Sequence, residues 1–165
     1  DGGAWTNSAD GWKYCYNDGY CARSKYVTID GSTYYFNGDA VMATGWVTFD
    51  GAWHWMTPSG RMATGWAKVG DAWYYLDPAT GAMATGWVDV DGSWYYLNAS
   101  GAMATGWTAV NGKWYYLTGN GAMAIGWVND GGTWYYLDAS GKMVTGWVSI
   151  DGMRYHFAPS GAWLG

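Results

Sequence analysis

The chain has 165 residues, a net charge of −5 and an aromatic content of 20%, with 15 Trp and 15 Tyr but only 3 Phe. All 13 acidic residues are Asp, and Lys and Arg together number 8. Nucleic acids and anionic membranes require clustered positive charge, so this composition excludes both as partners. No run of 18 or more apolar residues occurs, which excludes membrane insertion, and 27 Gly argue against long helices.

Gly-Trp pairs recur along the chain at a stride of 20 or 21 residues. A short fixed period indicates supersecondary units that bury their apolar surfaces only by stacking on their neighbours. We therefore expect one elongated repeat domain. The six pairs are Gly45-Trp46, Gly65-Trp66, Gly86-Trp87, Gly106-Trp107, Gly126-Trp127 and Gly146-Trp147.

Each unit has the pattern of a β-hairpin. Residues 85–103 read TGWVDVDGSWYYLNASGAM, in which two alternating β-favouring runs flank Asp91-Gly92. A two-residue Asp-Gly turn predicts that Val90 pairs with Ser93 and Trp87 with Tyr96. Equivalent turns are expected at Asp30-Gly31, Asp50-Gly51, Gly70-Asp71 (a swapped version), Asn111-Gly112, Asp130-Gly131 and Asp151-Gly152.

Both faces of such a hairpin carry large rings, because side chains alternate along a strand. Trp87, Trp94 and Tyr96 share one face, and Tyr95 and Leu97 lie on the other. Stacking the front of one hairpin on the back of the next buries both faces, and it leaves boxes with aromatic walls where coverage is incomplete. A box of two Trp and one Tyr favours a quaternary ammonium such as choline.

The string TGWVxVDGSWYYLxxSGAMATGW at 85–107 closely resembles the choline-binding repeats of Gram-positive cell-surface proteins. The match covers roughly 28–161. The resemblance implies an all-β fold, a left-handed solenoid of stacked β-hairpins, with one choline between consecutive repeats. It also implies a secreted protein at the bacterial cell surface or wall, with choline or phosphocholine of teichoic and lipoteichoic acids as partner and a homodimer as a further assembly.

Transferred onto this sequence, the family pattern gives two Trp from one repeat and the Tyr after the Trp of the next repeat at each site, with a loop Met such as Met83 or Met103 closing the box. The second Tyr of each repeat, such as Tyr96, is the reserve wall. The expected choline-binding sets are Trp46, Trp53 and Tyr74; Trp66, Trp73 and Tyr95; Trp87, Trp94 and Tyr115; Trp107, Trp114 and Tyr135; and Trp127, Trp134 and Tyr155.

The two ends depart from the pattern. Residues 1–27 are expected to form a degenerate capping repeat, and 28–165 to form the repeat solenoid with a degenerate last repeat. Lys25-Tyr26 and Thr33 replace the Trp residues of the first interface, which is expected to hold no ligand. Arg154 takes a Trp position and no repeat follows it, so Trp147 is expected to belong to a cap without ligand.

The only two cysteines, Cys15 and Cys21, lie in this first segment. Aligning Lys13–Cys21 on Trp94–Met103 with one deletion puts Cys15 at the second-Tyr position and Cys21 at the loop-Met position. These positions should touch in an ordinary repeat, so a disulfide between them is expected, in an oxidising location.

The predicted function is a non-catalytic wall-binding module that anchors a parent protein. Two His 102 residues apart offer no metal or acid–base site, no nucleophile motif occurs, and no cofactor is expected. One alternative is a glucan-binding repeat domain of an extracellular glucosyltransferase or toxin, with glycans as partners. Another is a structural spacer whose interfaces are filled by packing.

Overall fold

The computed structural model describes residues 2–165, and these form successive two-stranded antiparallel hairpins. The all-β prediction is confirmed, and no helix long and apolar enough to cross a bilayer occurs within this range. Two compact units divide the chain between Ala84 and Thr85.

Four hairpins form the first unit and four form the second. In the first unit, β1 (Gly3–Ser8) pairs with β2 (Gly11–Tyr16), β3 (Lys25–Ile29) with β4 (Ser32–Phe36), β5 (Gly45–Phe49) with β6 (Ala52–Met56), and β7 (Gly65–Val69) with β8 (Ala72–Leu76). In the second, β9 (Gly86–Val90) pairs with β10 (Ser93–Leu97), β11 (Gly106–Val110) with β12 (Lys113–Leu117), β13 (Gly126–Asp130) with β14 (Thr133–Leu137), and β15 (Gly146–Ile150) with β16 (Met153–Phe157).

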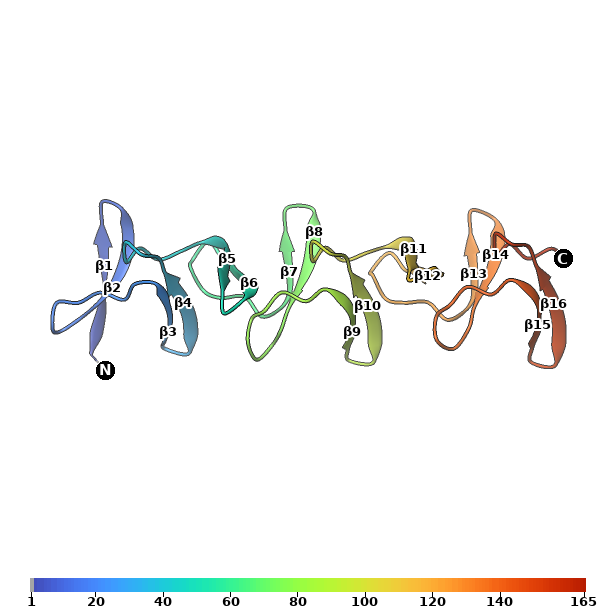
Figure 1. The fold of residues 1–165 in the computed structure, drawn as a ribbon, viewed down its shortest axis with the longest axis horizontal. Helices are drawn as coiled ribbons and strands as arrows, with labels where there is room; N and C mark the ends of the chain where they lie inside the picture. The colour runs from blue at the N-terminus through green and yellow to red at the C-terminus, as the bar shows by residue number, and fades with distance from the viewer. Residues whose placement is uncertain (1) are drawn as a thin grey trace. The chain divides into compact units, whose positions relative to one another are not determined.

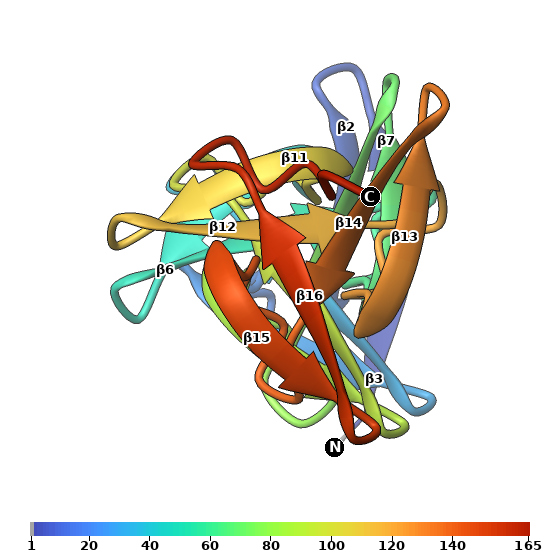
Figure 2. The same cartoon turned by 90° about the vertical axis from the view of Figure 1, so that its right-hand side faces the viewer.

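Successive hairpins within a unit rotate about a common direction. In the first unit they follow one another from blue to green (Figure 1). In the second unit β11–β12, β13–β14 and β15–β16 point in three different directions (Figure 2). This rotation sets each hairpin against the next.

The hairpin register agrees with the prediction. Val90 pairs with Ser93, and Trp87 pairs with Tyr96. Asp91 and Gly92 have φ of 53° and 83°, as a type I′ turn requires, and this turn matches the twist of the flanking strands. At the swapped turn only Gly70 has positive φ (61°), whereas Asp71 does not.

One turn prediction is wrong. The fifth equivalent turn uses Gly131 and Gly132, with φ of 59° and 88°, and Asp130 instead ends β13 opposite Thr133. Two glycines adopt left-handed backbone without steric cost, so this turn needs no Asp at its first position. Asp130 consequently takes a strand position that holds an apolar residue, such as Val90, in other repeats.

Within the described residues seven large side chains are fully buried: Phe36, Met56, Leu76, Leu97, Leu117, Leu137 and Phe157. Each ends the second strand of its hairpin and pairs through an isolated bridge with a residue of the following loop, as Leu97 does with Met103. The loops pack so tightly that a Cβ on Gly81 would lie 2.6 Å from Sδ of Met62. The repeated loop glycine therefore serves packing as well as turning.

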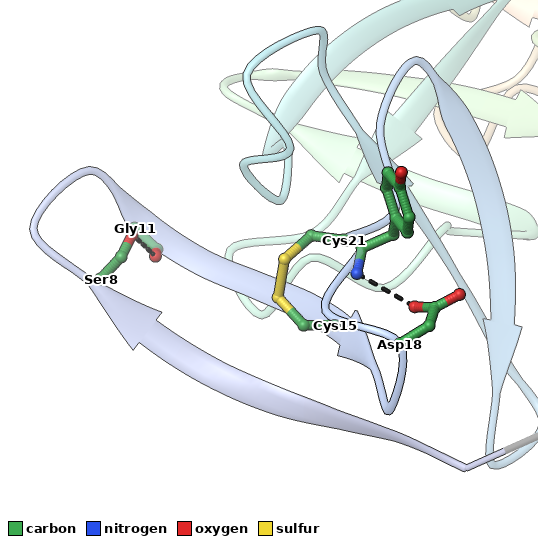
Figure 3. The surroundings of a disulfide bond; sticks show 6 residues. Ser8, Gly11, Cys15, Asp18 and Cys21 are labelled. Carbon is green, nitrogen blue, oxygen red and sulfur yellow. Dashed lines mark hydrogen bonds between the residues drawn. A yellow bond between two sulfur atoms is a disulfide. The ribbon is translucent and has the colours of Figure 1, made fainter.

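A disulfide joins Cys15 to Cys21 at the first hairpin, with Cα atoms 3.9 Å apart (Figure 3). The predicted alignment of this segment is corrected by the structure. Trp12 corresponds to Trp94 without any deletion, because Cys15 bridges Cys21 as Leu97 bridges Met103. Cys15 thus replaces the core Leu, not the second Tyr. The expected boundary between residues 27 and 28 lies inside β3.

Candidate ligand-binding boxes between hairpins

Trp87, Trp94 and Tyr115 line one cavity of about 370 Å³ with Met123. We call these four residues the Trp87 box. The Trp87 and Tyr115 rings stand edge to face, 4.8 Å apart at 65°, and Trp87 also contacts Tyr96 of its own hairpin at 5.1 Å. Ala139 and Ser140, from the loop after β14, close the rim. Three consecutive repeats therefore build this box.

The exposure of the second-strand Trp distinguishes the box from ordinary core. Trp94 is 44% exposed although Tyr115 beside it is 8% exposed. Burial of apolar area is favourable, so an indole whose only role was packing would be buried rather than 44% exposed. The arrangement leaves a π-face available to a ligand cation.

A backbone hydrogen bond sets the position of the Met wall. The Met123 N–H donates to the Trp94 carbonyl at 2.7 Å, while Ala124 donates to Tyr116 of the preceding strand at 2.8 Å. The loop is thus attached both to its own hairpin and to the previous one. Its polarizable thioether fills the fourth side of the box.

A carboxylate holds the rim loop. Asp138 accepts hydrogen bonds from the Ser140 N–H at 2.9 Å, the Ser140 hydroxyl at 2.6 Å and the Lys142 N–H at 3.0 Å. Burial raises the pKa of Asp138, but these hydrogen bonds, first that of the Ser140 hydroxyl, outweigh it and hold the pKa below its ordinary value. Asn98 makes the same three contacts two loops earlier in this unit with a neutral oxygen.

Three more predicted sets are brought together in the same way. The ring centroids of the first Trp and the following Tyr are 4.9 Å apart for Trp46 and Tyr74, 4.8 Å for Trp107 and Tyr135, and 5.0 Å for Trp127 and Tyr155. Met83 donates its N–H to Trp53, and Met143 to Trp114, each at 2.8 Å. We call these sets the Trp46 box (Trp46, Trp53, Tyr74, Met83), the Trp107 box (Trp107, Trp114, Tyr135, Met143) and the Trp127 box (Trp127, Trp134, Tyr155).

The predicted set Trp66, Trp73 and Tyr95 draws on both units. Trp66 and Trp73 belong to β7 and β8 of the first unit, and Tyr95 belongs to β10 of the second. Within the first unit Trp66 packs against Tyr75 at 5.1 Å, and Trp73 is 41% exposed. The set remains an expectation from the repeat pattern.

The structure adds a box that the sequence pattern conceals. Trp5, Trp12, Tyr34 and Met42 line a cavity of about 460 Å³, with Trp5 and Tyr34 4.8 Å apart at 74° and the Met42 N–H donating to Trp12. We call them the Trp5 box. Trp5 follows no Gly, and Gly11-Trp12 falls outside the 20-residue stride, so the periodicity alone misses both. Aligning Trp12 with Trp94 would have revealed the set.

The last box has a fourth aromatic wall. Trp163 takes the loop-Met position, because its backbone N–H donates to the Trp134 carbonyl at 2.8 Å. Its ring lies 6.0 Å from Trp127 and 6.2 Å from Tyr155. Trp163 therefore adds a fourth ring to the three of the Trp127 box, and we include it in that box from here on.

Trp147 already faces a cation of the chain itself. The Arg154 guanidinium lies 5.0 Å from its ring centroid, and His156 stacks on it at 4.3 Å and 3°. Arg154 pairs with Ser149 as Trp94 pairs with Asp89, so it occupies the second-Trp position. An intramolecular cation–π contact thus takes the place of a box at this ring.

Among residues 2–165 no group of three or more His, Cys or Asp is arranged to hold a metal ion. His54 is buried and stacks flat on Phe49 at 3.7 Å. The chemistry that the boxes offer is recognition of a soft cation by aromatic faces.

Comparison with known families identifies the repeats. A family model described as a choline-binding repeat matches residues 43–85, 84–126 and 124–164, and one described as a putative cell wall binding repeat matches 24–39. No curated protein sequence is significantly similar to the chain.

Solved structures of two Streptococcus pneumoniae proteins and of one phage endolysin share the fold. CbpJ is 38% identical with a TM-score of 0.87, covering 93% of this chain and 56% of that one. Choline binding protein F, solved in the presence of a peptidoglycan analogue, is 36% identical with a TM-score of 0.90, covering 98% and 57%. The pneumococcal cell wall endolysin of phage Cp-1, solved with choline, is 36% identical with a TM-score of 0.54, covering 74% and 37%. The chain thus spans little more than half the length of the first two.

Proposed function

Because this chain belongs to the choline-binding repeat family, we propose that it is a non-catalytic module that binds choline or phosphocholine of teichoic acids and anchors its parent protein to a Gram-positive cell wall. The observation that carries the proposal is the Trp87 box, in which a 44% exposed indole faces a buried Tyr across a cavity of about 370 Å³. A trimethylammonium group is easily dehydrated and is attracted by the negative faces of the rings.

Several weak sites on one chain can bind a polymer with high avidity. The Trp46, Trp87, Trp107 and Trp127 boxes, together with the Trp5 box, would meet several choline groups of one polymer. Once one box is occupied, the others bind at high effective concentration. The net charge of −5 favours a cationic ligand over an anionic one.

The alternatives receive less support from the boxes. A spacer filled by packing would not leave Trp53, Trp94 and Trp114 between 44% and 48% exposed. A glucan needs polar side chains to read its hydroxyls, whereas the four walls of the Trp87 box are three rings and a thioether.

Trp94→Ala tests the proposal at one site. We expect choline titrations followed by tryptophan fluorescence to show one site fewer, and the unfolding transition to change little, because Trp94 is half exposed. The matched control is Tyr96→Phe, which keeps the ring packed on Trp87. Unchanged choline binding in Trp94→Ala would contradict the proposal, and global unfolding would show that Trp94 has a structural role.

A further inference from the structure

One cavity of the first unit, of about 440 Å³, lies at the interface that corresponds to a box in the other repeats but has different walls. Tyr26 takes the first-Trp position, Thr33 the second-Trp position and His54 the position of the following Tyr. The Met62 N–H donates to Thr33 at 2.8 Å, as Met123 donates to Trp94. The backbone of a box is therefore kept while both indoles are lost.

The side chains that replace the rings can form hydrogen bonds, whereas the trimethylammonium group of choline has no donor or acceptor. Thr28 and Thr33 face each other across the hairpin, with their hydroxyl oxygens 3.3 Å apart. Each retains capacity for a further partner. The Thr33 hydroxyl thus stands where the other repeats present an indole, with the Thr28 hydroxyl beside it.

His54 adds a ring nitrogen that can form a hydrogen bond. Its Nδ1 lies 3.2 Å from the Ala52 carbonyl, which can only accept, so Nδ1 carries a proton and Nε2 is the ring nitrogen left for a second partner. The ring is 3% exposed and stacks flat on Phe49, which fixes its orientation. His54 is therefore a rigid polar wall of the cavity.

Asp50 supplies a carboxylate to the lining of this cavity. Within the described part of the chain its side chain makes no hydrogen bond, unlike Asp138. A free carboxylate accepts strongly from two neighbouring hydroxyl groups. The Tyr26 and Phe49 rings, 5.1 Å apart at 29°, give the same cavity an apolar surface.

We propose that this cavity binds a neutral pyranose residue of a glycan. A sugar ring has an apolar face that suits Tyr26 and a rim of hydroxyls that suits Asp50, Thr33 and His54. The volume lies in the range of small-molecule sites, and a few placed polar groups on an apolar lining are what such sites use to fix orientation. This proposal is independent of choline binding by the boxes.

The two histidines allow a direct test. His54 lines the cavity, whereas His156 stacks on Trp147 in the last hairpin. The ¹⁵N-labelled 165-residue chain is titrated with a β-linked N-acetylglucosamine trimer, with maltotriose, and with choline, and the ring signals of both histidines are followed by NMR. We expect at least one of the two sugars to shift His54 saturably without shifting His156, and choline to leave His54 unshifted.

Thr33→Val removes a hydroxyl, and Asp50→Asn removes the negative charge that strengthens the hydrogen bonds accepted by the carboxylate, so each should weaken sugar binding about tenfold. Asn is compatible with the turn, because Asn111 holds the equivalent position with φ of 50°. Asp151→Asn is the matched control, with φ of 51° at the same turn position. The proposal is overturned if neither sugar shifts His54, if only choline does, or if the two variants bind sugar as the wild type does. Choline binding by the boxes would stand in each of the three outcomes.

Discussion

The indole Nε1 of Trp107 donates a hydrogen bond to Oδ2 of Asp130 at 2.9 Å. This contact depends on the Gly131-Gly132 turn, which leaves Asp130 in the strand where other repeats place an apolar residue. A carboxylate consequently sits beside the Trp107 box. Its charge should add to the attraction of the rings for a cation.

Asp130→Asn should weaken choline binding at the Trp107 box up to about fivefold at low salt, because an exposed charge contributes up to about 1 kcal/mol. The variant keeps the hydrogen-bond acceptor for the indole, so the box geometry should remain. The shift of the Trp107 indole N–H signal during a choline titration measures the effect. Asp151→Asn is the control, and equal affinity of Asp130→Asn and wild type at low salt would refute the electrostatic role.

Trp12→Ala should remove the Trp5 box without unfolding the first hairpin. Trp12 is 46% exposed, whereas Trp5 contacts Tyr14, Tyr34 and Phe36. We expect calorimetric titration with choline to lose one site in Trp12→Ala, and Trp5→Ala to lower the free energy of unfolding by about 3 kcal/mol, as large-to-small changes at packed rings do. An unchanged number of sites in Trp12→Ala would show that this box is empty.

Replacing Cys15 and Cys21 together by Ser should lower the free energy of unfolding by about 2–3 kcal/mol, the amount expected from closing a short loop. Denaturant unfolding followed by circular dichroism measures the change. The matched variant is Cys15→Leu with Cys21→Met, which restores the pair formed by Leu97 and Met103. Stability should be partly recovered there, and a Ser variant as stable as the wild type would contradict a stapling role.

The rim loop of the Trp87 box should loosen in acid. The pKa of Asp138 is lowered on folding, so its contribution to stability is fully present above the unfolded value of 3.8 and is lost as the pH falls through the lower folded value. Asp138→Asn should keep the loop, as Asn98 does in its own loop. The difference in unfolding temperature between wild type and Asp138→Asn should be constant above about pH 5. Below pH 4 the unfolding temperature of the wild type should fall relative to that of the variant. A difference that does not change with pH would refute this role.

Much of the architecture follows from the sequence, because turn chemistry and the period of two act locally. Asp91-Gly92 sets the register of its hairpin, and the register places Trp87 and Trp94 on one face. The Tyr115 wall follows from stacking the next hairpin on that face.

The errors arise where residues outside the repeat consensus decide the outcome. Asp130-Gly131 looks like an ordinary turn, but the second glycine at 132 moves the turn by one residue. In the first hairpin the missing Gly before Trp5 conceals a complete box. Trp163 follows Ser160-Gly161-Ala162 as Met103 follows Ser100-Gly101-Ala102, and its bridge to Phe157 confirms that it takes the position of a Met.

The most direct test of choline recognition is a crystal structure of the chain grown with saturating choline. We expect a trimethylammonium group in the Trp87 box, within about 6 Å of the ring centroids of Trp87, Trp94 and Tyr115. Trp147 should keep Arg154 over its ring and bind no choline. A Trp87 box that stays empty at saturating choline, or choline bound only at surfaces outside the boxes, would contradict the proposed mode of binding.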